Sequence, residues 1–291
     1  MIISASRRTD IPTFYSTWLI NRVREGFCLV SNPINPRQIT RVSLLPSAVD
    51  AFVFWSKNPK PMLKFLGEFD SRGFVYYFQY TLNDYPRAFE PSVPDINSRL
   101  DTFRALSNRL GSKRVIWRYD PIIISSATNY SFHTSTFRRL AYALRGLTRR
   151  VVISTVDLYR KTGKRMAKLT SRCDTRRMEM QRDSPEILEM LSNIAKTASS
   201  VGMTPFSCAE KHTWSGIQAG ACIDHELIKS IGGHSSPKKD PGQRINCRCV
   251  ISRDIGKYDS CIHGCPYCYS TRDFELARQH HAKHNPESPM L

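Results

Sequence analysis

The sequence contains no apolar run that approaches the roughly 20 residues needed to cross a bilayer. Its first thirty residues also lack the basic start, apolar stretch and small-residue cleavage site of a secretory signal. We therefore expect a cytoplasmic protein with no membrane partner. Gly-x-Ser-x-Gly and a glycine-rich Lys-Ser/Thr loop are absent as well, which argues against serine hydrolases of that kind and against P-loop nucleotide-binding proteins.

Acidic residues are scarce relative to basic ones, since 25 Asp and Glu stand against 43 Lys and Arg, for a formal net charge of +18. The imbalance is strong in residues 101–182, which contain 19 Lys and Arg but 5 Asp and Glu. Such a surface attracts phosphates, so nucleic acid or a nucleotide is a reasonable partner. A solvated basic face without a partner is the alternative, because the chain has no recognised nucleic-acid-binding motif.

Cysteine is rare before residue 208, where only Cys28 and Cys173 occur, and we expect these two to be packing thiols. Seven further cysteines follow between residues 208 and 268. Disulfides are reduced in the cytosol, so this dense group indicates metal ligands rather than cross-links. It divides into a four-cysteine group and a three-cysteine group: Cys208, Cys222, Cys247 and Cys249, then Cys261, Cys265 and Cys268.

The two groups differ in how many ligands they offer to a metal. Four thiolates complete the coordination of a structural zinc or of a [4Fe-4S] cluster, whereas three leave one iron of a cluster open. We therefore expect one closed and one open site. The alternative is a zinc site that combines the three-cysteine group with Cys247 or Cys249.

Short β-branched and aromatic runs alternate with amphipathic helical patterns over the first two hundred residues. Most of the runs are apolar on both faces, as buried parallel strands are. This alternation predicts an α/β fold, in which a parallel (β/α) TIM-like barrel, complete or partly open, forms residues 1–207 and the cysteine-rich residues 208–291 complete it. An open doubly wound sheet is the second choice. The predicted strands span residues 2–6, 28–31, 51–56, 74–81, 114–119, 151–156 and 203–209.

Amphipathic helices are predicted between several of these strands. Asp95 and Ser184 are expected to be N-caps, since each precedes a helical pattern. In the last of these helices Leu188, Leu191 and Ile194 are expected to form the buried stripe. The clearest patterns span residues 12–26, 94–111 and 184–202.

Polar residues follow the predicted strands at their carboxyl ends, where barrel enzymes carry their active sites. We expect catalytic roles for Arg7, Arg8, Asp10, Arg118 and Asp120, and cofactor-binding roles for Lys57, Gln79 and Glu210, with Asp157 on the same rim. The basic members suit a phosphate or carboxylate. A helix cap at Asp10 and a turn at Asp120 are the structural alternatives.

The stretch CIHGCPYCYS (261–270) has the spacing Cys-x-x-x-Cys-x-aromatic-Cys, with Tyr267 as the aromatic. It resembles the motif of the radical S-adenosylmethionine superfamily, and its form CPYCY is most similar to that of spore photoproduct lyase and related members. The resemblance implies a [4Fe-4S] cluster on Cys261, Cys265 and Cys268 whose open iron chelates S-adenosylmethionine, with Tyr267 packed beside the cofactor. It further implies an electron donor such as flavodoxin or ferredoxin, and a 5'-deoxyadenosyl radical that abstracts hydrogen from a substrate.

Superfamily members carry this motif after their first strand, whereas here it comes last and no Gly-Gly-Glu accompanies it. In a closed or nearly closed barrel, however, the last unit lies beside the first. A short strand at 249–252, the cysteine loop and a helix at 271–284 reproduce the usual order of strand, cluster loop and helix. We therefore interpret the chain as a circular permutation of the superfamily barrel.

Six stretches are distinctive along the whole chain: IISASRRTDIP (2–12), VFWSKNPKPM (53–62), VIWRYDPI (115–122), CAE (208–210), CIDHELI (222–228) and CIHGCPYCYS (261–270). In these stretches the chain resembles the uncharacterised bacterial domain-of-unknown-function family 1848, which has no established activity. We therefore retain three hypotheses: a radical enzyme with a second, auxiliary cluster and a phosphate-bearing or nucleic-acid substrate, a zinc-stabilised nucleic-acid-binding protein, and an iron-sulfur electron-transfer or sensor protein without S-adenosylmethionine.

Overall fold

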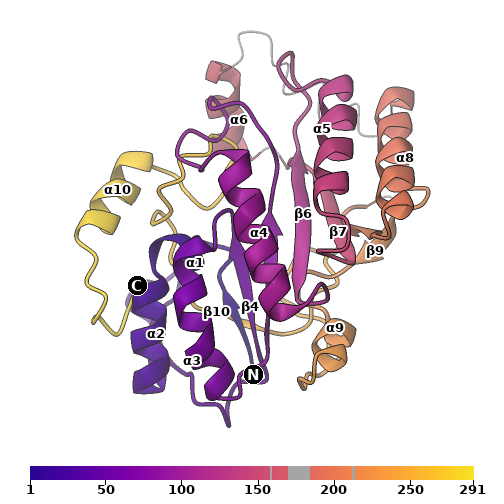
Figure 1. The fold of residues 1–291 in the computed structure, drawn as a ribbon. Helices are drawn as coiled ribbons and strands as arrows, with labels where there is room; N and C mark the ends of the chain where they lie inside the picture. Colours follow the sequence, from indigo (N-terminus) through magenta and orange to yellow (C-terminus); the bar gives the residue numbers. More distant parts are fainter. Residues whose placement is uncertain (158, 170–183, 212–213) are drawn as a thin grey trace.

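An eight-stranded sheet forms the centre of the computed structural model, which describes residues 1–157, 159–169, 184–211 and 214–291 (Figure 1). The strand order is β10-β1-β4-β5-β6-β7-β8-β9, and all of its described strand pairs are parallel. The predicted α/β class and parallel sheet are thereby confirmed. The strands are β1 (Ile2–Ala5), β4 (Ala51–Ser56), β5 (Tyr76–Thr81), β6 (Val115–Ile122), β7 (Arg150–Thr155), β8 (Thr204–Cys208), β9 (Gln218–Gly220) and β10 (Arg253–Asp254).

From β1 to β9 the spatial order of the strands follows the sequence, without the reversal that defines a doubly wound sheet. The last strand, β10, then pairs with the other side of β1. In the described part of the chain β9 and β10 are the two edges, so these strand pairs form an open sheet.

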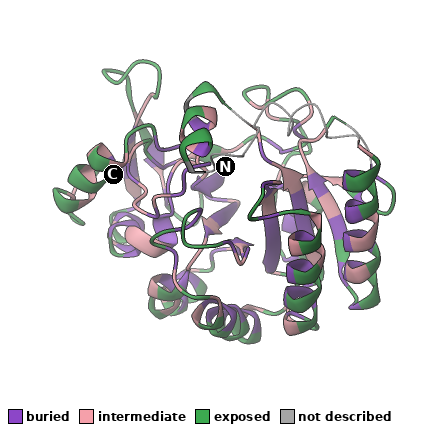
Figure 2. Ribbon diagram, turned by 90° about the horizontal axis from the view of Figure 1, so that it is seen from above, coloured by how far each residue is buried: buried purple, intermediate pink, exposed green. Residues whose placement is uncertain are grey.

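Most of the helices lie along the outside of the curved row of strands (Figures 1 and 2). We call the side that they cover the outer face and the opposite side the inner face. On the outer face the helices and strands share one large apolar core. The helices are α1 (Ile11–Phe14), α2 (Ser16–Glu25), η1 (Lys60–Phe65), α3 (Leu66–Ser71), α4 (Ile96–Leu110), α5 (Tyr130–Ala143), α6 (Arg160–Leu169), α8 (Pro185–Ser200), α9 (His225–Ser230) and α10 (Phe274–Ala282).

Both predicted helix caps are confirmed. The side chain of Asp95 accepts a hydrogen bond from the Ser98 amide at 3.0 Å, and that of Ser184 accepts one from the Ile187 amide at 3.3 Å. Leu188, in contrast, is 43% exposed, so its predicted burial is wrong. The buried stripe of α8 passes through its neighbour Ile187, which turns Leu188 toward solvent.

The predicted strand at 28–31 does not join the parallel sheet. It forms β2 (Phe27–Ser31), which pairs antiparallel with β3 (Ile39–Ser43) in a separate two-stranded sheet. The reason is the short connection of residues 32–38, since parallel neighbours need a crossover of a dozen residues or more. Cys28 is buried in this hairpin, whereas Cys173 lies outside the described residues.

Alternate residues of each strand face opposite sides of the sheet. Phe54 and Trp117 belong to the core of the outer face, whereas Val53, Tyr77 and Ile116 belong to a second apolar core on the inner face. Both sides are buried, which explains why the strands read as continuous apolar runs.

The cysteine-rich part of the chain covers the inner face. Ile223 and Val250 are buried there together with α9. The carbonyl oxygen of Cys222 accepts hydrogen bonds from the Tyr77 hydroxyl at 2.6 Å and from the Gln79 amide at 2.8 Å. The segment is therefore tied to the middle of the sheet by polar contacts as well as apolar ones.

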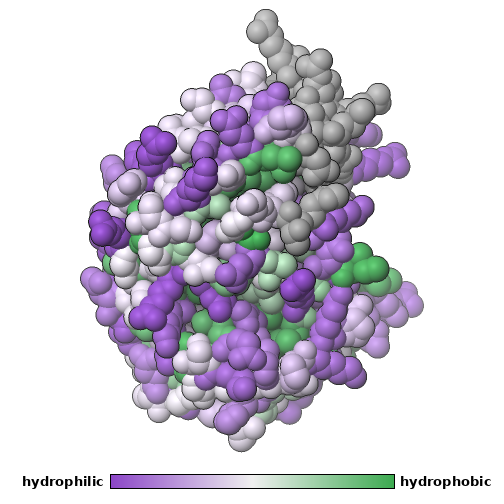
Figure 3. Space-filling model, turned by 90° about the vertical axis from the view of Figure 1, so that its right-hand side faces the viewer, coloured by the Kyte–Doolittle hydropathy of each residue, from purple (hydrophilic) through white to green (hydrophobic). Residues whose placement is uncertain are grey.

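The surface nearest α8 is mostly hydrophilic, with smaller groups of hydrophobic side chains among the polar ones (Figure 3). No helix of the described residues is long and apolar enough to cross a membrane.

The strand predicted at 249–252 forms slightly later, as β10, because Asp254 fixes its position. The Asp254 carboxylate accepts hydrogen bonds from the hydroxyls of Ser4 and Ser6, at 2.8 and 2.6 Å, and from the amide of Arg7 at 2.9 Å. It also accepts one from the Gly256 amide at 2.9 Å. One buried carboxylate therefore joins the last strand to the first.

We expect the Asp254→Ala substitution to lower the free energy of unfolding by about 3 kcal/mol, because it leaves several partly buried donors without an acceptor. Urea denaturation of the full chain measures the change. Asp101→Ala is the matched control, since Asp101 is 74% exposed in its ion pair with Arg104 and is expected to cost less than about 1 kcal/mol. Equal losses in the two variants would contradict the role assigned to Asp254.

Candidate functional site

A cavity of about 530 Å³ lies at the carboxyl ends of the strands, and all seven late cysteines line it. Its volume falls in the range of small-molecule sites. The four-cysteine and three-cysteine groups, which belong to different segments, thus open into one space. The predicted rim residues that also line it are Arg7, Arg8, Asp10, Lys57, Arg118, Asp120, Asp157 and Tyr267.

The four-cysteine group converges from three segments: the end of β8, the residues before α9 and the loop before β10. The sulfurs of Cys208 and Cys222 are 3.0 Å apart, and Cys249 shares thiol hydrogen bonds with Cys222 and Cys247. The bond with Cys249 lowers the pKa of Cys247 to about 7. The fold therefore brings all four thiols together.

Arg118 ties this group to the sheet. Its Nη1 donates to Cys222 Sγ at 2.8 Å and to Gln79 Oε1 at 3.2 Å, while its Nε donates to Asp120 Oδ2 at 2.9 Å. Burial lowers the pKa of the Arg118 guanidinium, but Asp120 and the nearby thiols outweigh this effect and raise it overall. Arg118 is thus a cation held against a thiol, and its hydrogen bonds are used within the protein.

The four-cysteine group fits zinc or a [4Fe-4S] cluster by the chemistry of its donors, because both take four thiolates. The thiols do not have the arrangement of ligands around one metal ion, because no group of three His, Cys, Asp or Glu side chains in the described residues has metal-binding geometry. Cys208 and Cys222, at 3.0 Å, are also closer than the roughly 3.8 Å between two thiolates on one tetrahedral zinc. Metal binding here requires the thiols to separate slightly and to lose their protons.

The three-cysteine group lies on the loop that follows β10. The loop is attached to the chain after β1, because the hydroxyls of Tyr269 and Ser270 each donate to the Arg7 carbonyl oxygen at 3.0 Å. Arg165 of α6 donates to the carbonyl oxygens of Cys268 and Thr271 from the other side. These contacts hold the loop at the carboxyl end of the sheet.

Asp10 connects three segments at the base of this loop. Its carboxylate accepts from the amides of Thr13, at 3.0 Å, and Lys57, at 2.8 Å, and from His263 Nε2 at 2.9 Å. Burial raises the pKa of Asp10, but the hydrogen bond and charge of His263 outweigh burial and lower it overall. The cap interpretation of Asp10 is correct, and its carboxylate joins the start of α1, the residue after β4 and the cysteine loop.

Lys57 and Glu90 form a buried ion pair beside the same loop. Lys57 Nζ lies 2.7 Å from Glu90 Oε1, to which the Tyr267 hydroxyl also donates at 2.5 Å, and Arg99 Nη1 lies 3.6 Å from Glu90 Oε2. Burial raises the pKa of Glu90, yet the charges of Lys57 and Arg99 outweigh burial and lower it overall. Burial raises the pKa of the adjacent Cys265 thiol to about 12, although Lys57 opposes this shift.

Two predicted cofactor residues do not line the cavity. Gln79 is buried beneath it, where it bonds to Cys222 and Arg118, because its side chain points into the covered inner face. Glu210 accepts hydrogen bonds from the amide and hydroxyl of Thr155, at 2.8 and 3.2 Å. Both therefore support the rim rather than form its surface. The turn considered at Asp120 does not form, since β6 continues to Ile122.

The sequence patterns missed several residues that the structure brings to the site. Asp254 and His263 lie far from the first strand in sequence, and Glu90 lies in a proline-containing loop, nine residues after the end of β5. An isolated acid among apolar residues, as in AFEP (88–91), is the one signal that pointed to Glu90.

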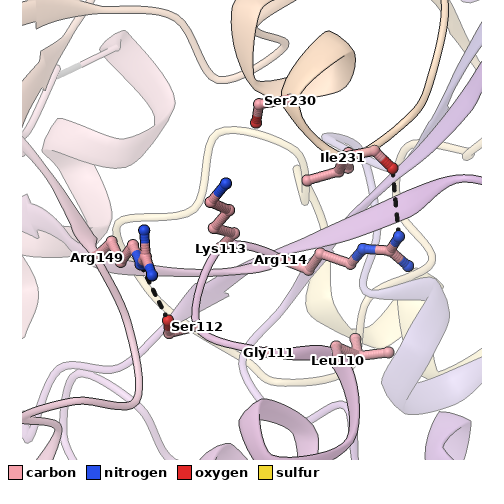
Figure 4. A pocket seen from close by; sticks show the side chains of 8 residues that line it. All are labelled: Leu110, Gly111, Ser112, Lys113, Arg114, Arg149, Ser230 and Ile231. Atoms are coloured by element: carbon pink, nitrogen blue, oxygen red, sulfur yellow. Dashed lines mark hydrogen bonds between the residues drawn. The ribbon is translucent and has the colours of Figure 1, made fainter.

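A second cavity, of about 490 Å³, lies at the opposite ends of β6 and β7 (Figure 4). It contains three basic side chains, of which Arg114 donates to the Ile231 carbonyl oxygen and Arg149 to the Ser112 hydroxyl, each at 3.3 Å. None of its lining residues in the described chain is a cysteine, histidine or acid. The cysteine-lined cavity is therefore the candidate site.

The fold and this cavity define an α/β protein whose parallel sheet carries a cysteine-lined site at the carboxyl ends of its strands. The chain belongs to the family described as Domain of unknown function (DUF1848), which matches residues 2–270. The predicted family membership is confirmed, and both cysteine groups lie within the match. No curated protein matches the chain.

We expect Glu90→Gln to lower the free energy of unfolding by about 3–5 kcal/mol at pH 7, because Lys57 and Arg99 then remain charged and buried without their acid. The Glu90 pKa lies below its ordinary 4.5 in the folded state, so its contribution is present above that pH and is lost as the pH falls through the folded value. The difference between variant and parent is therefore expected to shrink in acid. Urea denaturation from pH 7 to pH 3 measures it.

Glu68→Gln serves as the control. Glu68 pairs with Arg24 and Arg72 on the surface, where ion pairs contribute less than about 1 kcal/mol. A Glu90 variant as stable as the Glu68 variant at pH 7 would contradict the structural role of the buried pair.

Proposed function

We propose that this protein is a radical S-adenosylmethionine enzyme in which Cys261, Cys265 and Cys268 hold a [4Fe-4S] cluster with one open iron. The observation that supports the proposal best is that the three-cysteine loop faces the same cavity as the four-cysteine group and the polar strand ends. When bound, the cluster supplies one-electron cleavage of S-adenosylmethionine. The protein's own residues bind the substrate, exclude water and hold the loop.

The order of elements supports the interpretation as a permuted, partly open (β/α) barrel. The last strand, β10, lies beside β1, the cysteine loop follows it, and α10 comes next along the chain. Ordinary members of the superfamily have the same local order at their start. We infer that permutation moved the strand, loop and helix to the end of the chain while leaving their place beside the first strand unchanged.

The rim residues divide into those that bind and those that position. Asp10, Lys57 and Arg118 already have partners within the protein, so they hold the loop and the four-cysteine group. Arg7 and Arg8 also have partners, since each lies 3.9 Å from the Asp254 carboxylate and Arg7 Nη1 donates to Gln243 Oε1 at 2.8 Å, but they line the cavity with 20% and 22% of their side chains exposed. We assign these two arginines to the carboxylate or phosphate of a cofactor or substrate.

The four-cysteine group is proposed to hold an auxiliary [4Fe-4S] cluster. Zinc is the second candidate, and the observation that favours it is structural: Cys222, Cys247 and Cys249 lie in the apolar layer that covers the sheet's inner face. A zinc ion there stabilises the fold without taking part in catalysis. With zinc at this site and no iron on the loop, the protein is a zinc-stabilised binding protein.

Metal analysis of anaerobically prepared protein tests the proposal. We expect about eight irons and eight sulfides per chain for two clusters, and Cys265→Ala is expected to lose about half of the iron, since each cluster contains four. Cys28→Ala is the matched control, because Cys28 is a buried thiol outside both groups and is expected to leave the iron content unchanged. Stoichiometric zinc with no iron would contradict the proposal.

Reduction in the presence of S-adenosylmethionine separates the enzyme from an electron-transfer or sensor protein. We expect the iron-loaded protein, reduced by dithionite or by a flavodoxin or ferredoxin, to form 5'-deoxyadenosine, and the Cys265→Ala variant to form none. A fully loaded, reducible cluster that yields no 5'-deoxyadenosine would favour the electron-transfer or sensor function instead.

A further inference from the structure

Exposed aromatic rings gather at the mouth of the cysteine-lined cavity. Of the Phe, Trp and Tyr rings in the described chain, four are exposed: Tyr142, Tyr159, Tyr258 and Tyr269, at 58, 44, 39 and 43%. Three of them, all except Tyr142, line this cavity. We call Tyr159, Tyr258 and Tyr269 the tyrosine rim.

The tyrosine rim is assembled from two parts of the chain that are distant in sequence, the residues after β7 and the loop between β10 and α10. Tyr159 follows β7, Tyr258 follows β10, and Tyr269 directly follows the last cysteine of the loop. The rings of Tyr159 and Tyr269 are 6.0 Å apart with a tilt of 45°. The fold therefore brings exposed aromatic rings from separate parts of the chain to one opening. Grouped exposed apolar surface of this kind marks an interaction site.

Arginines extend this aromatic surface into the cavity. The guanidinium of Arg8 lies 5.3 Å from the centre of the Tyr258 ring, and that of Arg7 lies 5.7 Å from the centre of the Trp55 ring. Both arginines line the cavity together with Trp55. Stacked arginine and aromatic groups recur in proteins that bind the bases of single-stranded nucleic acids.

Exposed basic residues flank each tyrosine of the rim. Arg160 and Lys164 follow Tyr159, Lys257 precedes Tyr258, and Arg272 lies three residues after Tyr269. With a net charge of +18 for the whole chain, these side chains offer partners for a phosphate backbone. Basic side chains and stacking aromatic rings are the two components of a surface that binds single-stranded nucleic acids.

The size of the cavity restricts what enters it. A space of about 530 Å³ suits a group of small-molecule size and not a double helix. Chemistry on a base requires that the base leave its stack, as it does in a single strand. An unstacked nucleotide on a strand satisfies both the small cavity and the basic surroundings.

We propose that the tyrosine rim binds a nucleobase of a single-stranded nucleic acid, presenting that nucleotide to the cysteine-lined cavity while the flanking cations bind the strand's phosphates. The inference rests on the proposed function, because the proposed radical chemistry is the reason for bringing a nucleotide to this cavity. Binding itself requires no reduction of the cluster, so the two are tested separately.

Fluorescence anisotropy with a labelled 12-nucleotide DNA strand tests the proposal on the full, metal-loaded chain. We expect Tyr159→Ala and Tyr258→Ala each to weaken binding about 5- to 100-fold, because base stacking on an aromatic side chain contributes about 1–3 kcal/mol. Tyr159→Phe and Tyr258→Phe keep the ring and are expected to retain the affinity. Tyr142→Ala, the exposed tyrosine outside the cavity, is the matched control and is expected to bind as the parent does.

Further ligands distinguish the sources of the nucleobase. A DNA strand and an RNA strand of the same sequence compare the two sugars, and tighter binding of either one supports the proposal. Blunt duplex DNA and a mononucleotide are expected to compete at least tenfold less well than the strand. If the mononucleotide competes as well as the unlabelled strand at equal concentration, the strand's phosphates do not contribute to binding and that part of the proposal is overturned.

Two further results would overturn the proposal as a whole. One is that Tyr159→Ala, Tyr258→Ala and Tyr142→Ala all bind the strand as the parent does, which would leave a purely ionic surface. The other is that the metal-loaded parent does not bind the strand at low salt. If the protein binds the strand but forms no 5'-deoxyadenosine, the proposed function is contradicted and this inference is supported. If it forms 5'-deoxyadenosine but does not bind the strand, this inference is contradicted and the proposed function is supported.

Discussion

The structure depends on how the inner face of the parallel sheet is covered. Such a sheet needs apolar contacts on both sides, and here most of the helices cover the outer one, while the short α9 is the helix that packs on the inner one among the described residues. Residues from Cys222 to Val250 cover the inner face, held by the Tyr77 and Gln79 hydrogen bonds to Cys222 and by Arg118 on its sulfur. The same packing that completes the core therefore assembles the four-cysteine group.

Beyond this covered part of the inner face, the carboxyl ends of the strands line a cavity and carry charged side chains. On β5 the inner face changes from Tyr77 to Gln79 two residues further along, and on β6 it changes from Ile116 to Arg118. The buried charges are paired, as the cost of burial demands. This network positions the cysteine loop, while the partly exposed Arg7 and Arg8 and the exposed tyrosine rim line the opening of the cavity.

Much of the fold was predictable because it depends on local patterns. Apolar runs predicted six of the eight sheet strands, and short capping motifs such as that at Asp95 predicted helix starts. The misplaced elements depended on pairing partners: β2 needed β3, and β10 is positioned by the bonds of Asp254 to Ser4 and Ser6. The sequence alone does not show which distant residues lie close enough to pair.

The amino-acid sequence by itself determined the α/β class, the family and the two groups of cysteines, because spacing and periodicity are properties of neighbouring residues. Only the tertiary structure decided that both groups open into one cavity and that Glu90, Asp254 and His263 support it. Those contacts join residues up to 253 positions apart. Their energies arise from burial and charge pairing, which exist only once the sheet has brought the segments together.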